Sequence, residues 1–210
     1  TLTAMSQPLP RTIYIRPPTT YNIPQSPSND TQPFQPPPLP FLLRTWTVTH
    51  STLSMWRSAR NVRITYTSLP PTSSNLQHMD DLVEYESLNG SGSVKTVQGI
   101  DTPSTLDDTS SWNWKGKGWL FFARSHWEVL GWGERPLEGG GEGELERWVV
   151  TWFEKTVFTE EGVDVYSDRE VGCSEGLLAE VVEGLKGVEE LKGLVGKLRR
   201  VESVLPWKKG

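Results

Sequence analysis

Two histidines are the side chains of this 210-residue chain that are best suited to acid–base chemistry near neutral pH. His50 ends the alternating run WTVTH, and His126 begins the run HWEVL. Either imidazole could act as a general base, with Glu84, Tyr85 or Glu128 as its partner. A histidine at the end of a strand more often makes a structural hydrogen bond or contacts a ligand than acts as a catalyst. A catalytic and a non-catalytic role therefore both stay open.

Tryptophan is the second residue type with a chemical use, because the chain holds ten and all lie at or after Trp46. An indole buries a large apolar area and carries one N–H that seeks a hydrogen-bond acceptor. These side chains either fill a thick aromatic core or line a cavity for a flat, apolar ligand. The candidates for ligand contact are Trp46, Met55, Trp56, Tyr66, Trp114, Trp127 and Trp152.

The sequence predicts neither a metal site nor a nucleotide site. The three histidines are far apart and Cys173 is the single cysteine, so no ligand spacing typical of a metal centre occurs. The glycine-rich stretches 90–93 and 139–143 lack the spacing of a phosphate-binding loop and are typical of hairpin turns. We therefore expect no cofactor.

Composition restricts the partners and the compartment. The net charge of -5 and the pI of about 5.3 give no reason to expect nucleic acid or an anionic membrane as a partner. No apolar run reaches the roughly 18 residues of a spanning helix, and residues 1–40 lack the apolar block of a signal peptide. A single cysteine fits a reducing compartment. We expect a cytoplasmic protein, or a mitochondrial one if residues 1–40 are a processed transit region; the sequence predicts no oligomeric state.

Strand-like segments must position these side chains. Alternation of β-branched and aromatic residues predicts about eight antiparallel strands. They cover residues 41–50, 61–68, 80–88, 93–100, 112–124, 125–133, 147–155 and 162–167. Asn89-Gly90 predicts a hairpin turn. Residues 51–60 interrupt the alternation and are long enough for a helical turn that lies like a lid across one end of a barrel.

The two ends of the chain differ from this central part. Residues 1–40 hold eleven of the sixteen prolines, which excludes helix and sheet interior and predicts an extended or disordered tail. Ser174 is typical of a helix N-cap and is followed by apolar residues at helical spacing. We expect three parts: the tail at 1–40, a barrel with its helix at 41–198, and a basic tail at 199–210.

The order of elements resembles the lipocalin branch of the calycin superfamily. Trp46 is similar to the tryptophan of that family's first strand, and SEGLLAE from Ser174 resembles the start of its outer helix. The resemblance covers roughly residues 41–198 and extends to a group of soluble fungal lipocalin-like proteins. It implies an all-β, up-and-down antiparallel barrel of about eight strands with one C-terminal α-helix packed outside.

The chain also departs from the family. Arg44 stands where the family has a glycine, two residues before the tryptophan. The resemblance implies a basic residue lying over Trp46, and Lys155 and Arg124 are the two candidates.

The implied function is the binding of a small hydrophobic or aromatic molecule in a cavity open at one end. The fold by itself implies no chemistry. One alternative is a cofactor-independent cyclase or isomerase of secondary metabolism, which would enclose and orient its substrate in the same cavity. A third hypothesis is an interaction protein that acts through the proline-rich tail.

Overall fold

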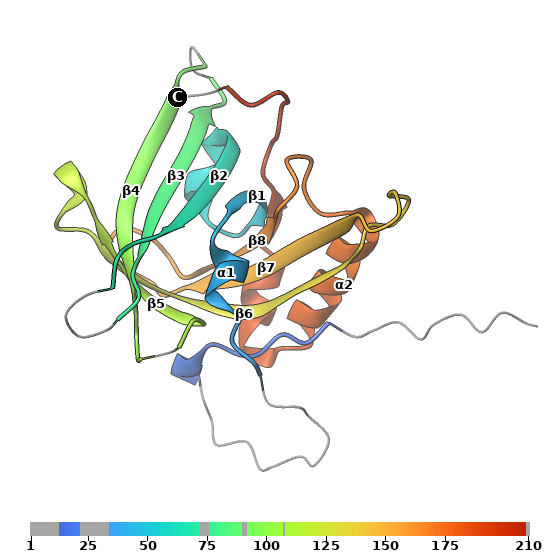
Figure 1. Ribbon diagram of the computed structural model, residues 1–210, viewed down its shortest axis with the longest axis horizontal. Helices are drawn as coiled ribbons and strands as arrows, with labels where there is room; N and C mark the ends of the chain where they lie inside the picture. Colours follow the sequence, from blue (N-terminus) through green and yellow to red (C-terminus); the bar gives the residue numbers. More distant parts are fainter. Residues whose placement is uncertain (1–12, 22–33, 72–75, 90–91, 107, 209–210) are drawn as a thin grey trace, which may run out of the picture.

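A closed antiparallel barrel forms the body of the protein (Figure 1). The computed structural model describes residues 13–21, 34–71, 76–89, 92–106 and 108–208. The barrel strands are β1 (Thr45–Ser51), β2 (Ala59–Ser68), β3 (Met79–Ser87), β4 (Val94–Pro103), β5 (Ser111–Gly116), β6 (Arg124–Pro136), β7 (Leu145–Phe153) and β8 (Gly162–Ser167). Each strand pairs with the next, and β1 pairs with both β2 and β8, which closes the cylinder. The predicted up-and-down barrel is confirmed.

Short helices and one further strand complete the described chain. They are η1 (Thr19–Tyr21), α1 (Leu39–Leu42), η2 (Ser54–Ser58), η3 (Gly118–Leu120), α2 (Glu175–Lys186), η4 (Glu189–Leu191), α3 (Lys192–Val195) and β9 (Arg199–Arg200). β9 pairs with the last residues of β1, on the edge opposite to β8. β3 and β4 form the predicted hairpin, although the turn residues 90 and 91 lie outside the described residues. None of the described helices is long and apolar enough to cross a membrane.

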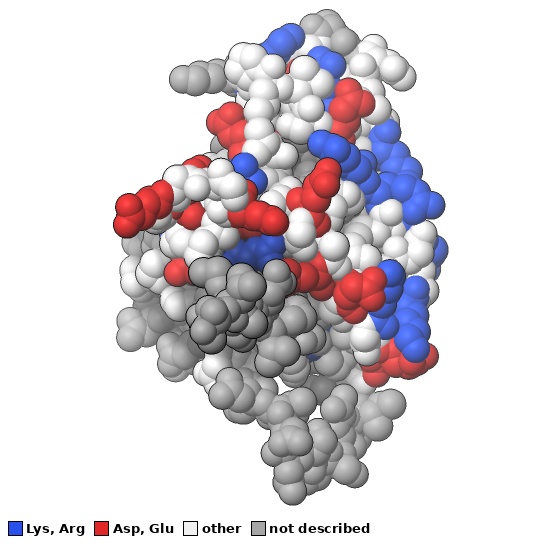
Figure 2. Space-filling view, turned by 90° about the vertical axis from the view of Figure 1, so that its right-hand side faces the viewer, with Lys and Arg blue, Asp and Glu red and all other residues white. Residues whose placement is uncertain are grey.

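The C-terminal helix packs outside the barrel, as the sequence predicts. The Ser174 hydroxyl accepts a hydrogen bond from the Leu177 N–H at 3.3 Å, which caps the first turn. Leu177, Val181 and Leu185 are buried against apolar residues on the outer faces of β7 and β8. The face of the molecule that includes α2 carries acidic and basic side chains side by side (Figure 2). Lys186 pairs there with Glu183 within the helix, so the exposed side of α2 is polar.

Two of the predicted strand boundaries are wrong. The strand predicted from residue 41 begins at Thr45, because Pro40 favours a first helical turn and α1 forms before it. The strand predicted at 112–124 ends at Gly116, and η3 follows with Gly118 at φ +59°. A left-handed residue of this kind does not fit a continuous strand.

An N-terminal strap, residues 13–21, crosses the outside of the barrel between β6 and α2 (Figure 1). The Arg16 N–H donates to the Leu130 carbonyl at 2.9 Å, and Ile15 is buried. Two glycines make room for it: a Cβ at Gly131 would lie 2.5 Å from Ile15, and one at Gly184 would lie 3.0 Å from it. The strap belongs to the predicted tail, whose residues 1–12 and 22–33 lie outside the described chain.

Candidate functional site

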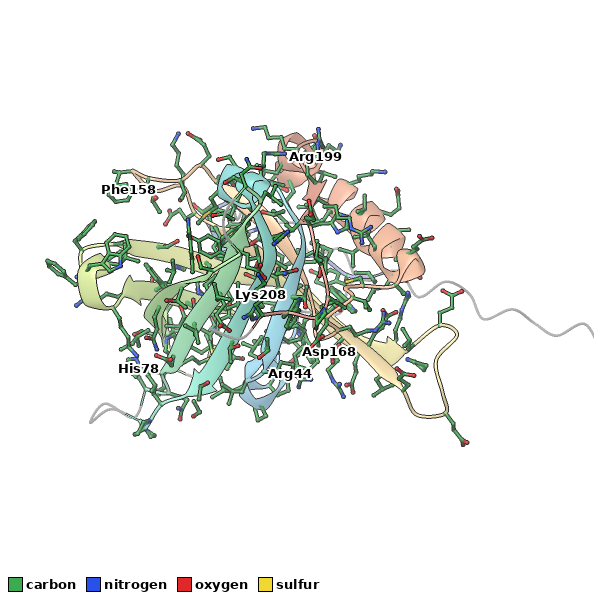
Figure 3. All side chains as sticks on the ribbon, turned by 90° about the horizontal axis from the view of Figure 1, so that it is seen from above. Arg44, His78, Phe158, Asp168, Arg199 and Lys208 are labelled. Atoms are coloured by element: carbon green, nitrogen blue, oxygen red, sulfur yellow. The ribbon has the colours of Figure 1, made fainter. Side chains whose placement is uncertain are left out.

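A cavity of about 760 Å³ enters the barrel at the end where η2 and η3 lie. Its mouth is an apolar rim of exposed side chains from three different connections: Met55, Trp119, Phe122 and Phe158. Phe158 lies in the β7–β8 connection, at the same end of the barrel as the β5–β6 connection (Figure 3). Its ring centroid is 6.3 Å from that of Phe122. Residues 54–58 form the predicted helical turn at this mouth. A second hollow of about 920 Å³ adjoins the rim between η2 and the β7–β8 connection.

Aromatic faces make up much of the wall. The indoles of Trp56, Trp114 and Trp127 and the phenols of Tyr66 and Tyr85 all line the cavity. The Tyr66 and Trp127 rings stack with centroids 5.6 Å apart, and Trp56 meets Tyr85 edge-on at 5.6 Å. Successive side chains of a strand point to opposite faces, and these rings occupy positions that face the inside of the barrel.

Three buried aspartates lie among these rings, and sequence reasoning did not single out any of them. Asp81 and Asp164 line the cavity, and Asp101 lies behind its wall. The Asp164 carboxyl accepts hydrogen bonds from the Ser51 hydroxyl at 2.5 Å and from the Trp56 indole at 3.4 Å. The Asp101 carboxyl accepts one from the Trp127 indole at 2.8 Å. The indoles therefore wall the cavity with their faces while their N–H groups hold carboxyl groups.

Burial dominates the titration of these carboxyl groups. It raises the pKa of Asp164 to about 7, although the hydrogen bonds from Ser51 and Trp56 oppose the shift. It likewise raises the pKa of Asp101 to about 7 against the Trp127 hydrogen bond. Burial, and then the charge of Asp101, raise the pKa of Asp81 well above its ordinary value. Groups of this kind can hold or release a proton near neutral pH.

A glycine makes the β4 wall flat enough for an indole. Gly99 pairs with Asp81 on β3 and with Gly116 on β5. A Cβ at Gly99 would lie 2.2 Å from the Nε1 atom of Trp114, so no larger residue fits there without displacing the ring. The Trp114 indole is held next to Asp81, where its N–H partly opposes the rise in the pKa of that carboxyl.

The predicted catalytic residues do not form one cluster, although the predicted pair of His126 and Glu128 does meet, with Nε2 of His126 3.4 Å from Oε1 of Glu128 outside the cavity. His126 lies on the outer face, because its neighbour Trp127 points inward, and its ring contacts Asn113 at 3.0 Å. His50 lies at a bulge in β1, contacts Thr49 at 3.4 Å and is not part of the cavity wall.

The remaining predicted residues are also divided between the two faces. Glu84 faces outward and pairs with Arg63 at 3.1 Å, whereas Tyr85 faces the cavity. Of the predicted ligand contacts, Trp46 fills the opposite end of the barrel, where its indole donates to the Leu42 carbonyl at 2.9 Å. Trp152 lies outside the barrel in the α2-facing cluster. The other five, named above, line the cavity.

An arginine lies over the first-strand tryptophan, but it is neither of the predicted candidates. The Arg44 guanidinium is 5.4 Å from the centroid of the Trp46 ring. It also lies 3.7 Å from the carboxylate of Asp168, the residue that follows β8 (Figure 3). Lys155 instead pairs with Glu160, and Arg124 lies at the mouth of the cavity. The departure from the family's glycine thus supplies the cation that covers the indole.

A second polar cluster anchors the strap on the outer face. Glu128 is fully buried, and its carboxylate accepts hydrogen bonds from Arg16 at 2.7 Å and from the Thr19 hydroxyl at 2.5 Å. Burial raises the pKa of Glu128, but hydrogen bonds from His126 and Thr19 and the charge of Arg16 outweigh it and hold the pKa at about 2. The cluster is a structural ion pair away from the cavity. In the described residues no group of three or more histidine, cysteine or acidic side chains could hold a metal ion.

Comparison with known proteins gives a likeness of fold. No sequence-family model matches the chain, and no curated protein matches it in sequence. Lobster apocrustacyanin A1 is 8% identical with a TM-score of 0.50, and the match covers 78% of both chains. Apocrustacyanin C2 is 6% identical with a TM-score of 0.49 over 79% of both chains. The siderocalin Ex-FABP is 10% identical with a TM-score of 0.48 over 79% of this chain and 96% of its own. The chain has the lipocalin-like fold that its sequence implies; the likeness to the fungal group stays a prediction.

Proposed function

We propose that this lipocalin-like barrel binds a small, mainly apolar molecule with an aromatic or similarly flat framework. The observation that carries the proposal is the cavity of about 760 Å³, which is walled by indole and phenol rings and open at one end. Its volume lies within the roughly 300–1,000 Å³ of small-molecule sites. Ring faces bind flat apolar molecules by dispersion and stacking, with about 0.5–1.5 kcal/mol per aromatic pair beyond the area buried.

The rim supports the same proposal. Trp119 is 75% exposed and Phe158 is 71% exposed, and both lie at the mouth. Exposed apolar side chains gathered at one place on a protein mark a contact site. An apolar ligand entering the lumen would cover part of this surface. The cytoplasmic location and the role in secondary metabolism that the sequence suggested remain parts of the proposal.

Nile red, a flat and uncharged fluorescent dye, tests the proposal. We expect saturable quenching of tryptophan fluorescence together with a blue-shifted rise in dye emission. Val83→Trp adds a large ring to the cavity wall and should weaken binding about tenfold or more. Val171→Trp, the same change at a residue that is 57% exposed, is the matched control and should bind like the parent protein. Equal binding by parent and Val83→Trp would place the dye elsewhere and contradict the proposal.

The second candidate is an isomerase or cyclase that uses the same lumen. One observation favours it: Asp164 lies on the cavity wall and its pKa is raised to about 7 by burial. Such a carboxyl can take a proton from one carbon of an enclosed substrate and return it to another. This reading transfers the acid–base role from His50 and His126 to the lumen. Recovery of an altered ligand, with its formation abolished by Asp164→Asn, would establish it; recovery of unchanged ligand would support simple binding.

A further inference from the structure

The deep part of the lumen holds acidic groups without a basic partner. Burial is the main cause that raises the pKa of both Asp81 and Asp164, and for Asp81 the charge of the buried Asp101 adds to it. Lys95 and Arg124, the basic residues of the cavity lining, are exposed at its mouth. The lumen is therefore acidic at depth and basic only where water reaches it.

Some oxygens of this cluster lack hydrogen bonds. Asp81 is 7% exposed and Asp101 is 0% exposed, and neither Oδ1 of Asp81 nor Oδ2 of Asp101 has a partner among the described residues. A buried acceptor without a donor destabilises the fold, and more so if it is charged. The Asp81 side chain lines the cavity, so a donor on a ligand can reach this part of the wall.

The carboxyl groups converge on two phenols. Burial is the main cause that raises the pKa of Tyr166 and of Tyr66; the charges of Asp164 and Asp81 add to it for Tyr166, and those of Asp81 and Asp101 add to it for Tyr66. Tyr66 also pairs with Asp81 across β2 and β3. The side chains of Asp81 on β3 and Asp164 on β8 thus both belong to the wall of the aromatic cavity, and Asp101 on β4 is buried behind it.

We infer that the lumen selects ligands in which an aromatic or apolar framework carries a protonated amine, with the ammonium group lodged beside Asp81 and Asp164 and the rings against the indoles. This inference rests on the proposed function and specifies its ligand class. An ammonium group has three donors and no acceptor, so it fits a wall where the unpaired Oδ1 atom of Asp81 lies in the same lining as the carboxyl group of Asp164. Its charge balances the carboxylates in a site of low dielectric, whereas an anionic ligand would add to the repulsion.

Three probes that share one ring system test the inference: naphthylethylamine, naphthylethanol and naphthylacetate. Affinities are measured by tryptophan quenching at about pH 8, where the amine is protonated. We expect the amine to bind about tenfold tighter than the alcohol, and the acid to bind weakest. Asp81→Asn should remove the preference of the amine over the alcohol while leaving the affinity for the alcohol within about twofold.

Asp80→Asn is the matched control. Asp80 is the neighbour of Asp81, but it lies on the outer face, where it pairs with Lys117. We expect this variant to keep the preference for the amine. Asp164→Asn is the second lumen variant and should also reduce the preference for the amine over the alcohol. It tests the inference independently if Asp81→Asn does not fold. Equal affinity for all three probes would overturn the inference and leave the proposed function standing. No saturable binding of any probe, or of Nile red, would overturn both.

Discussion

Replacing Asp164 by asparagine should change how stability depends on pH. The parent carboxyl has an ordinary pKa of 3.8, and burial raises it to about 7 in the folded protein. Between these values the unfolded chain releases the proton while the folded protein keeps it, so the free energy of unfolding falls as pH rises. Three pKa units correspond to at most about 4 kcal/mol. That is a large part of the 5–15 kcal/mol typical of a domain.

The neutral amide of Asp164→Asn does not titrate. The free energy of unfolding of the variant minus that of the parent should therefore be constant below about pH 4, grow by up to about 4 kcal/mol between pH 4 and 7, and level off above pH 7. Lost contacts with Ser51 or Trp56 would shift the whole curve without changing its slope.

Urea unfolding followed by tryptophan fluorescence at intervals from pH 4 to pH 8.5 measures this difference. Glu183→Gln on the exposed side of α2 is the control, and its difference from the parent should vary by less than about 1 kcal/mol over the same range. A curve for Asp164→Asn that is equally flat would refute a raised pKa for this carboxyl. It would also weaken the case for proton transfer in the lumen.

Three further predictions concern other parts of the molecule. Arg16→Met should lower the free energy of unfolding at pH 7 by about 3–5 kcal/mol in urea titrations, because Glu128 is left buried and charged; adding Glu128→Gln should restore part of the loss, and no restoration would contradict this reason. Gly99→Ala should cost about 1–3 kcal/mol and alter the near-ultraviolet circular dichroism by displacing Trp114, so an unchanged spectrum would count against the close contact. Burial raises the pKa of Cys173 to about 11, so iodoacetamide should react slowly with this thiol at pH 8 until urea is added. Equal reaction rates with and without urea would contradict the raised pKa.

Alternation in the sequence was enough to predict the barrel but not which face of each strand points inward. In β8 the two valines, Val163 and Val165, face outward because α2 covers them, so the polar Asp164 and Tyr166 face the lumen. A strand with one face in water would have the opposite arrangement. An acidic residue between valines, just before an apolar helix, was the available signal for Asp164.

The histidine hypothesis depended on a register that the sequence does not reveal. His50 shares a face with Trp46 in a regular strand, but the β1 bulge between Val48 and His50 shifts the register. The capped helix at Ser174 was predictable because its signals are local. The strap was not, because its contacts with Glu128 and Leu130 join residues more than a hundred positions apart.

That separation has a consequence for biosynthesis. The strap is translated before the barrel, yet its partner Glu128 follows 112 residues later, so Arg16 has no counter-charge until β6 has left the ribosome. Contacts between residues so distant in sequence form slowly, because the intervening chain must first be ordered. We expect the strap to dock late in folding, after most of the barrel has been synthesised.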